Sequence, residues 1–282
     1  QDTKFAIIAD SNLQIGTLDN SNVCSIKPRN CESRPLLFSI HKEPLSLFVS
    51  FEKGMNFVVS SFLLPSFSST FSHDLQEYEE ITSFYYHEAL KTTFFGTAIN
   101  SPKSPLKGML IAVKELFNEF TVVCREEIDG NVFTITSSKP NNLIVGSTCK
   151  LIIMSVSSLF NGTIKMEVLQ IVPTEVIPRS ISILGPFIIY FGSKKSISIY
   201  QEQKDESYTK YDEIFIKTDI HTGFIGKPLS AHSCHAFTIE NQKTLTISLL
   251  NFEDDTVTRD ILTSYEFEGP VSFFHLVRDG FA

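Results

Sequence analysis

Short apolar runs of β-branched, aliphatic and aromatic residues alternate with short polar segments along almost the whole chain. The stretch NNLIVGSTCKLIIM (141–154) shows the pattern, with two apolar runs on either side of Gly146, Ser147 and Thr148. A phosphate loop of the Walker type needs a lysine directly after its second glycine and a helix to follow, and this stretch has neither. The pattern therefore favours a buried hairpin that turns at 146–148, with strands covered on both faces.

The same hairpin pattern occurs six times in the chain. The second strands begin at steps of 42, 54, 41, 46 and 48 residues, near Leu13, Met55, Met109, Lys150, Ser196 and Thr244. A further strand precedes each hairpin after the first, and one more follows the last. These six strands begin at Pro35, Phe84, Val132, Ile181, Pro228 and Val271. Their steps of 49, 48, 49, 47 and 43 residues are more even than those of the hairpins. A fourth strand follows several hairpins, as at 164–172 and 212–219.

Four antiparallel strands in every repeat of this length are the signature of a β-propeller, in which each blade buries its faces against its neighbours. A β-sandwich with regularly spaced strands is the alternative. We expect an all-β chain that forms a single β-propeller domain over 1–282, with six to seven four-stranded blades. Residues 264–282 either complete the blade begun at 5–25, or the chain lacks about one blade of a longer propeller. The best amphipathic segment, 74–86, is expected to be only a helical turn in a loop.

Composition and charge narrow the class of protein further. Of the 282 residues, 42% are hydrophobic, which is enough for a sizeable core. No charge-free apolar run reaches the ~18 residues of a membrane-spanning helix, and no targeting signal is visible. Five scattered cysteines indicate a reducing compartment, the cytosol or the nucleus. The formal charge of −8 disfavours direct binding of DNA or RNA, which relies on clustered Lys and Arg.

The densest group of ligand-type side chains is AHSCHAF (231–237), which contains His232, Cys234 and His235. A zinc site needs four converging ligands. On a strand, however, His232 and Cys234 share one face while His235 points to the other, so packing or a loop end is the favoured interpretation. A nucleophilic Cys-His pair would also need a third, orienting group, and the sequence indicates none.

Some propellers are glycosidases, which are built on paired carboxylates. The candidate carboxylates Asp10, Asp19, Asp74 and Glu88 fall at unlike strand positions, whereas a central active site takes its residues from equivalent strand ends. The sequence therefore favours a protein that is not an enzyme and holds no cofactor or metal. A propeller hydrolase is kept as a minor alternative.

Five groups of segments resemble those of a known family and follow its order: 11–19 (SNLQIGTLD), 94–98 with 107–113 (FFGTA, KGMLIAV), 129–154, 185–201 and 273–281. The chain resembles the C-terminal propeller of a family of large three-propeller proteins. This family includes the large subunit of the damaged-DNA-binding complex, which is a cullin-RING ligase adaptor, and relatives in polyadenylation, splicing and heterochromatin. The resemblance implies that the chain is a fragment of a larger multi-propeller protein.

This resemblance implies a nuclear, non-enzymatic scaffold: the adaptor propeller of a cullin-RING E3 ubiquitin ligase complex. The missing tryptophan and the apolar loops favour a divergent paralogue that serves chromatin silencing or DNA repair. The implied partners are a WD-repeat substrate receptor, the other propellers of the parent protein and the cullin ligase complex, without a membrane. The alternative is a propeller of an RNA 3′-end processing or splicing factor subunit.

Segments that enter the innermost strands of a propeller converge at one end of its channel and form a shallow apolar platform for a helix or loop. In the resembling family, this platform and the N-terminal propeller clamp a helical segment of a substrate receptor. Carried over by position, the partner-binding residues are Asn131, Phe133, Thr134, Ile181, Ser182, Phe224, Phe281 and Ala282. Aromatic residues of this kind anchor interfaces. The alternative is that Phe133 and Phe281 only fill spaces between blades.

Overall fold

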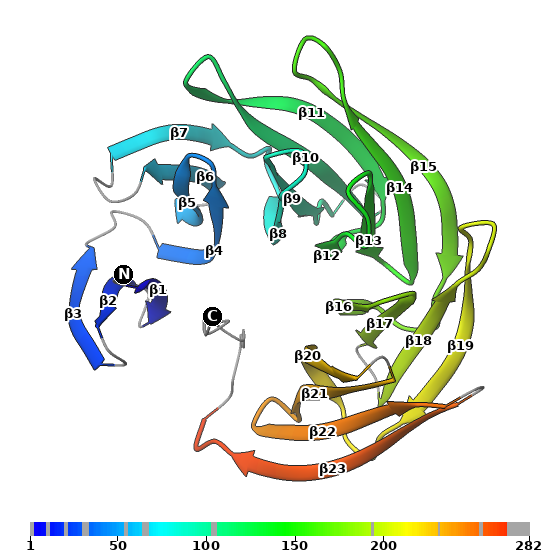
Figure 1. Ribbon diagram of the computed structural model, residues 1–282. Coiled ribbons are helices and arrows are strands. Elements are labelled where there is room, and N and C mark those ends of the chain that lie inside the picture. Colours follow the sequence, from blue (N-terminus) through cyan, green and yellow to red (C-terminus); the bar gives the residue numbers. More distant parts are fainter. Residues whose placement is uncertain are drawn as a thin grey trace. The chain divides into compact units, whose positions relative to one another are not determined.

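The fold is all-β and propeller-like, built from consecutive antiparallel sheets (Figure 1). The computed structural model describes residues 3–9, 12–19, 22–29, 34–53, 56–63, 68–102, 106–192, 195–230, 232–253 and 256–269. Within these ranges every regular element is a strand, and no helix long and apolar enough to cross a membrane occurs. The all-β prediction is confirmed.

The strands are grouped by sheet in chain order. The first sheet holds β1 (Thr3–Ala9), β2 (Asn12–Asp19) and β3 (Asn22–Arg29). The second holds β4 (Arg34–Lys42), β5 (Leu45–Lys53), β6 (Asn56–Leu63) and β7 (Ser68–Asp74). The third holds β8 (Glu79–His87), β9 (Thr92–Ile99), β10 (Lys107–Leu116) and β11 (Glu119–Asp129). The fourth holds β12 (Val132–Thr136), β13 (Asn142–Ser147), β14 (Lys150–Ser158) and β15 (Ile164–Pro173). The fifth holds β16 (Pro178–Leu184), β17 (Phe187–Gly192), β18 (Ser196–Glu202) and β19 (Tyr208–Phe215). The sixth holds β20 (Ile220–Ser230), β21 (Ser233–Glu240), β22 (Thr244–Phe252) and β23 (Val257–Glu266).

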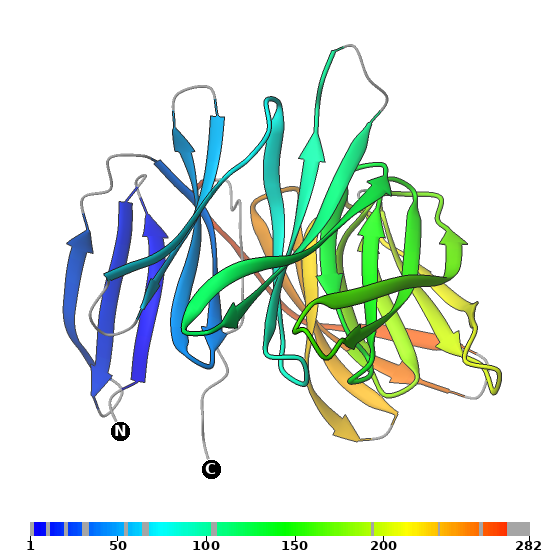
Figure 2. The ribbon, with the colours of Figure 1, turned by 90° about the horizontal axis from the view of Figure 1, so that it is seen from above.

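Each sheet is a simple meander, in which every strand pairs with the strand next to it in the sequence. Figure 2 gives a second view of these twisted sheets. The hairpin predicted at 141–154 is formed by β13 and β14, but its turn lies at Thr148 and Cys149, because Ser147 pairs with Lys150. Cys149 takes the positive φ of the turn, 54°. Gly146, predicted as a turn residue, instead pairs with Leu151 inside the hairpin.

Other boundaries also differ from the sequence prediction, and β8 begins at Glu79 rather than at Phe84. The first strand of the sixth sheet begins at Ile220 rather than near Pro228, and Gly223 and Gly226 lie within β20. The fourth strand predicted at 212–219 is β19, which starts at the buried Tyr208. Residues 264–266 belong to β23 and so do not begin a strand of the first sheet, and 270–282 lie outside the described residues. Of the segment 74–86, expected as a helical turn, Asp74 ends β7, Glu77 and Tyr78 form a turn, and 79–86 lie in β8.

Side chains on both faces of a sheet are buried, as the continuous apolar runs predict. On β17 the neighbouring residues Ile188 and Ile189 are both fully buried, yet they point to opposite faces and join different cores. Ile188 packs with residues of the fourth sheet, such as Ile144, and Ile189 packs with residues of the sixth, such as Leu250. A third core joins the second and third sheets through Phe48 and Phe95. Each core thus lies between consecutive sheets.

The chain divides into two compact units. The first comprises residues 1–132 and 157–165, and it contains the first three sheets. The second comprises residues 133–156 and 166–282, and it contains the fifth and sixth sheets and most of the fourth. The interpretation of 1–282 as one propeller domain stays a prediction.

Gly146 allows two inner segments of the second unit to approach β13 closely. A Cβ atom at Gly146 would lie 2.5 Å from Thr134 Cγ2 and 3.1 Å from both Cβ and the carbonyl oxygen of Pro178. A side chain therefore has no room here without movement of β12 and β16.

Gly146→Val is expected to lower the free energy of unfolding by about 1–3 kcal/mol, because overpacking shifts the strands on both sides. Gly269→Ala is the control, since a Cβ at Gly269 meets no atom within 4 Å. Chemical denaturation of both variants measures the difference. Equal midpoints for Gly146→Val and the wild type would disprove the close approach.

A buried ion pair crosses the sixth sheet from its outermost strand. Arg259 on β23 donates to Glu240 Oε1 over 2.7 Å and to Ser248 Oγ over 2.8 Å, and the two charged side chains are only 7% and 10% exposed. Thr238 and Thr218 donate to the same carboxylate. Burial opposes ionisation of Glu240, but its hydrogen bonds outweigh burial and hold the pKa of this carboxyl below its usual 4.5.

Because the pKa of Glu240 is lower in the folded than in the unfolded chain, its ionisation stabilises the fold above about pH 4.5, and this stability is lost as the pH falls further. Glu240→Gln is expected to cost about 3 kcal/mol at neutral pH, since it leaves Arg259 buried without its counter-charge. The difference from the wild type should shrink in acid. Urea titrations between neutral and acid pH measure it, with the exposed Glu266→Gln as control. A difference that does not change with pH would contradict the assignment.

Candidate partner-binding site on the first strands

We call the strand that comes first in the chain order of each sheet its first strand. Hydroxyl side chains on the first strand of one sheet form hydrogen bonds with backbone groups of the first strand of the next sheet. On β8, Thr82 Oγ1 donates to the carbonyl of Gly96 in its own sheet over 3.1 Å and also to the carbonyl of Val132 on β12. On β16, Ser180 Oγ accepts from the Gly223 amide over 3.0 Å and Ser182 Oγ accepts from the Ile225 amide over 3.1 Å. An edge strand leaves alternate backbone groups without a ladder partner, and these hydroxyls satisfy some of them.

The hydrogen bonds from Ser180 and Ser182 place β16 and β20 side by side within the second unit (Figure 1). Two of the predicted partner-binding positions, Ser182 and Phe224, are brought together there, because Ser182 binds the amide of Ile225, the residue next to Phe224. The Phe224 ring stacks on Phe237, with centroids 5.0 Å apart and planes 11° apart. Ile181 is half-buried and packs against the core between the fourth and fifth sheets.

The predicted residues of the fourth sheet have mixed environments. Asn131, just before β12, is 8% exposed, and its Nδ2 donates to Asn100 Oδ1 over 3.1 Å. Thr134 directs its methyl group toward Gly146. Phe133 is the neighbouring residue on β12, so its side chain points to the opposite face of the strand, where it is half-buried. Phe281 and Ala282 lie outside the described residues.

Most of these side chains thus also have a structural role, which fits the alternative of packing between sheets. Phe133, Ile181 and Phe224 keep part of their surface exposed. Sequence reasoning missed the hydroxyls of Thr82 and Ser180. The alternation of serine with isoleucine in 180–183 was the signal, since a small hydroxyl at every second position of a first strand suits an edge that meets another strand.

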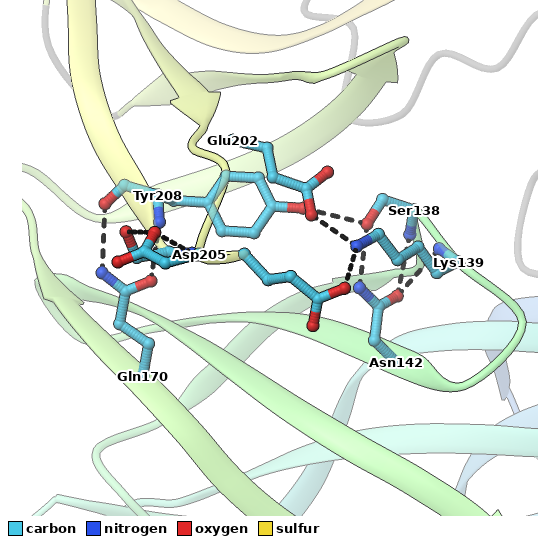
Figure 3. A network of polar contacts seen from close by, with 9 residues as sticks. Ser138, Lys139, Asn142, Gln170, Glu202, Asp205 and Tyr208 are labelled. Atoms are coloured by element: carbon cyan, nitrogen blue, oxygen red, sulfur yellow. Dashed lines mark hydrogen bonds and ion pairs between the residues drawn. The ribbon is translucent and has the colours of Figure 1, made fainter.

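A polar network fixes the turn that follows β12 (Figure 3). Asn142 Oδ1 accepts the backbone amides of Ser138 and Lys139 over 3.1 and 2.9 Å, and its Nδ2 donates to Ser138 Oγ over 2.9 Å. Ser138 Oγ is 3.1 Å from the Tyr208 hydroxyl. Gln170 on β15 forms two hydrogen bonds with the backbone of Tyr208. The network therefore ties the end of β12 to β15 and β19, all within the second unit.

The network also includes an ion-pair cluster of one lysine and two glutamates. Lys139 Nζ lies 2.5 Å from Glu202 Oε1 and 3.0 Å from Glu206 Oε1. Hydrogen bonds to Glu202 and Glu206 raise the pKa of Lys139, so the ammonium stays charged. Burial raises the pKa of the Tyr208 hydroxyl, so it acts as a neutral hydrogen-bonding group. These groups are suited to holding the turn in place.

Asn142→Ala is expected to destabilise the fold by about 1–3 kcal/mol, because it leaves two amides of the turn without their acceptor. The amides of Ser138 and Lys139 should exchange faster in deuterated buffer. Asn141→Ala is the matched control, because the neighbouring Asn141 side chain is exposed. Unchanged exchange at the two amides in Asn142→Ala would refute the role of the network.

The His-Cys segment at 231–237 does not bring its ligand-type side chains together among the residues described. Cys234 is fully buried in the core between the fifth and sixth sheets, and burial raises the pKa of its thiol to about 11. A thiol with this pKa is protonated at neutral pH and is not an activated nucleophile. His235 lies half-buried on the opposite face of β21. No group of three or more His, Cys, Asp or Glu suited to a metal occurs in the described ranges.

No protein-family model matches the chain, and no curated protein matches it significantly.

Proposed function

We propose that the chain is a protein-interaction scaffold: the adaptor propeller of a cullin-RING E3 ubiquitin ligase complex that holds a substrate receptor. The observation that carries the proposal is the pairing of first strands by hydroxyl side chains, as β16 and β20 show. This pairing sets side by side two strands that each carry a half-buried apolar residue, Ile181 on one and Phe224 on the other. A shallow apolar surface of this kind suits a helix or loop of a protein partner.

The choice of this scaffold rests on the resemblance of the ordered sequence segments to the adaptor family. A nuclear location and a role in chromatin silencing or DNA repair belong to the same proposal. The partners would be a WD-repeat substrate receptor, the other propellers of the parent protein and the cullin complex. The polar network at Ser138 and Asn142 supports the proposal physically, because an anchored β12 presents Phe133 with little loss of conformational entropy on binding.

Purification of the full-length parent protein from cells, with mass spectrometry of what accompanies it, tests the proposal. A cullin and a WD-repeat receptor are the expected companions. Phe133→Asp should lower the recovered receptor at least about tenfold, because a buried charge at a contact aromatic is not compensated. Its melting temperature should stay near that of the wild type, because Phe133 is only half-buried.

Phe215→Asp is the matched control, since Phe215 is 80% exposed at the end of β19 and has no predicted contact. Full receptor recovery with Phe133→Asp would remove Phe133 from the site. Polyadenylation or spliceosomal subunits in place of cullin would favour the alternative scaffold in RNA processing. Turnover of a glycan or ester by the isolated chain would instead support a hydrolase.

A further inference from the structure

Two hairpin tips that belong to the first unit carry the same three residues. Leu116-Phe117-Asn118 joins β10 to β11, and Leu159-Phe160-Asn161 follows β14. Phe117 is 98% exposed and Phe160 is 114% exposed, so neither ring gains burial within the described part of the chain. Leu159 beside them is 47% exposed. Figure 1 shows both hairpins projecting from their sheets.

The first tip holds its phenylalanine in an unfavourable backbone conformation. Leu116 pairs with Glu119, which leaves a two-residue turn with φ of 55° at Phe117 and 67° at Asn118. Two successive positive φ angles define a type I′ turn, which asparagine and glycine tolerate. For a bulky residue this backbone conformation costs roughly 1–2 kcal/mol of conformational free energy. Phe117 thus combines a strained backbone with an exposed aromatic ring.

The second tip is rigid for a different reason. The Gly162 amide donates to the Leu159 carbonyl over 2.9 Å, and the Leu159 amide donates to the Thr163 carbonyl over 2.8 Å. Asn161 Oδ1 accepts from the backbone amide and the hydroxyl of Thr163, over 3.1 and 2.6 Å. Phe160 therefore lies on a turn that these four hydrogen bonds hold in place.

The two tips lie against each other. A Cβ at Gly162 would lie 2.7 Å from Leu116 Cδ2, so only glycine allows this approach without movement of Leu116. Lys114 Nζ donates to Ser158 Oγ over 3.3 Å and links the same two hairpins. Leu116, Phe117, Leu159 and Phe160 thus form one apolar projection, the twin-tip surface.

We propose that the twin-tip surface binds the twin-tip surface of a second copy of this chain. Two phenylalanines and two leucines offer on the order of 500 Å² per copy, or about 1,000 Å² for a symmetric pair. That area lies at the lower limit of specific interfaces, so the dimer is weak and depends on concentration. The rigid turns support association, because little conformational freedom remains to be lost.

Charge favours a second copy over an anionic membrane. The tips are flanked by Lys114 and Lys165 and by Glu115 and Glu119, two of each sign, although the chain as a whole carries −8. Two copies therefore meet at a locally neutral surface, and a two-fold arrangement can set lysines against glutamates. The two carboxylates beside Phe117 would oppose an anionic lipid surface.

Sedimentation velocity of the 282-residue chain over about a hundredfold range of concentration tests the proposal. The weight-average sedimentation coefficient should rise toward the dimer value in the wild type, and more so when salt screens the net repulsion between copies. Phe117→Ser and Phe160→Ser should each weaken association at least about tenfold, and the double variant should stay monomeric. Phe215→Ser, which removes an exposed aromatic on another strand, should associate like the wild type.

A second measurement needs no substitution. Amide exchange at 116–119 and 159–163 should slow as the wild-type concentration rises, whereas exchange at 201–208 should not change. A wild-type chain that is monomeric at every concentration would overturn the proposal. So would flotation of the wild type, but not of the double variant, with phosphatidylcholine–phosphatidylserine vesicles, because this result would assign the tips to a bilayer.

Discussion

Burial of both faces of short antiparallel sheets is the constraint on which the rest of the structure depends. A four-stranded meander with apolar residues at successive positions cannot be stable with either face in water. The fifth sheet shows this most directly, since Tyr190 and Phe191 are neighbours on β17 but belong to the cores on its two sides. Every sheet needs the next one, and this need explains the regular repeat along the chain.

Close packing of successive sheets determines where small and polar residues stand. Gly146 makes room for Thr134 and Pro178, and serine hydroxyls on β16 satisfy amides of β20. Arg259 and Glu240 show how charge is accommodated within a sheet, because the two groups pair with each other and also bind neighbouring hydroxyls. These polar contacts add specificity to a fold whose free energy comes mainly from apolar burial.

The two binding proposals rest on two parts of this architecture. The first strands carry half-buried side chains on a braced backbone, and we propose that a partner docks there on a shallow platform. The tips of the β10–β11 and β14–β15 hairpins each carry a phenylalanine, Phe117 or Phe160, that does not pack within the described part of the chain. The aromatic rings at Phe117 and Phe160 are therefore informative, because neither stabilises the fold through burial.

Much of the strand order was predictable, because the apolar runs and polar turns are local signals. The β13–β14 hairpin, the first strands at Val132 and Ile181 and the outer strand at 164–172 all lie where the pattern indicates. One prediction that missed involves glycine. Gly146 looked like a turn, because glycine in a sequence indicates only conformational freedom. It lies inside a strand, as does Gly223, and at both positions the missing side chain makes room for a distant residue.

The sequence by itself determined that the chain is all-β, because short continuous apolar runs bounded by polar turns are typical of strands that are covered on both faces. It also determined the repeat, and with it the need of each sheet for a neighbour. Only the tertiary structure decided the roles of single residues on the first strands. Whether the side chain of Thr134 or Phe224 packs against its own sheet or stays available to another protein depends on which strand, distant in the sequence, lies next to it. The contact of the two Leu-Phe-Asn tips was decided there as well, since the sequence repeats the residues but does not show that Leu116 and Gly162 meet.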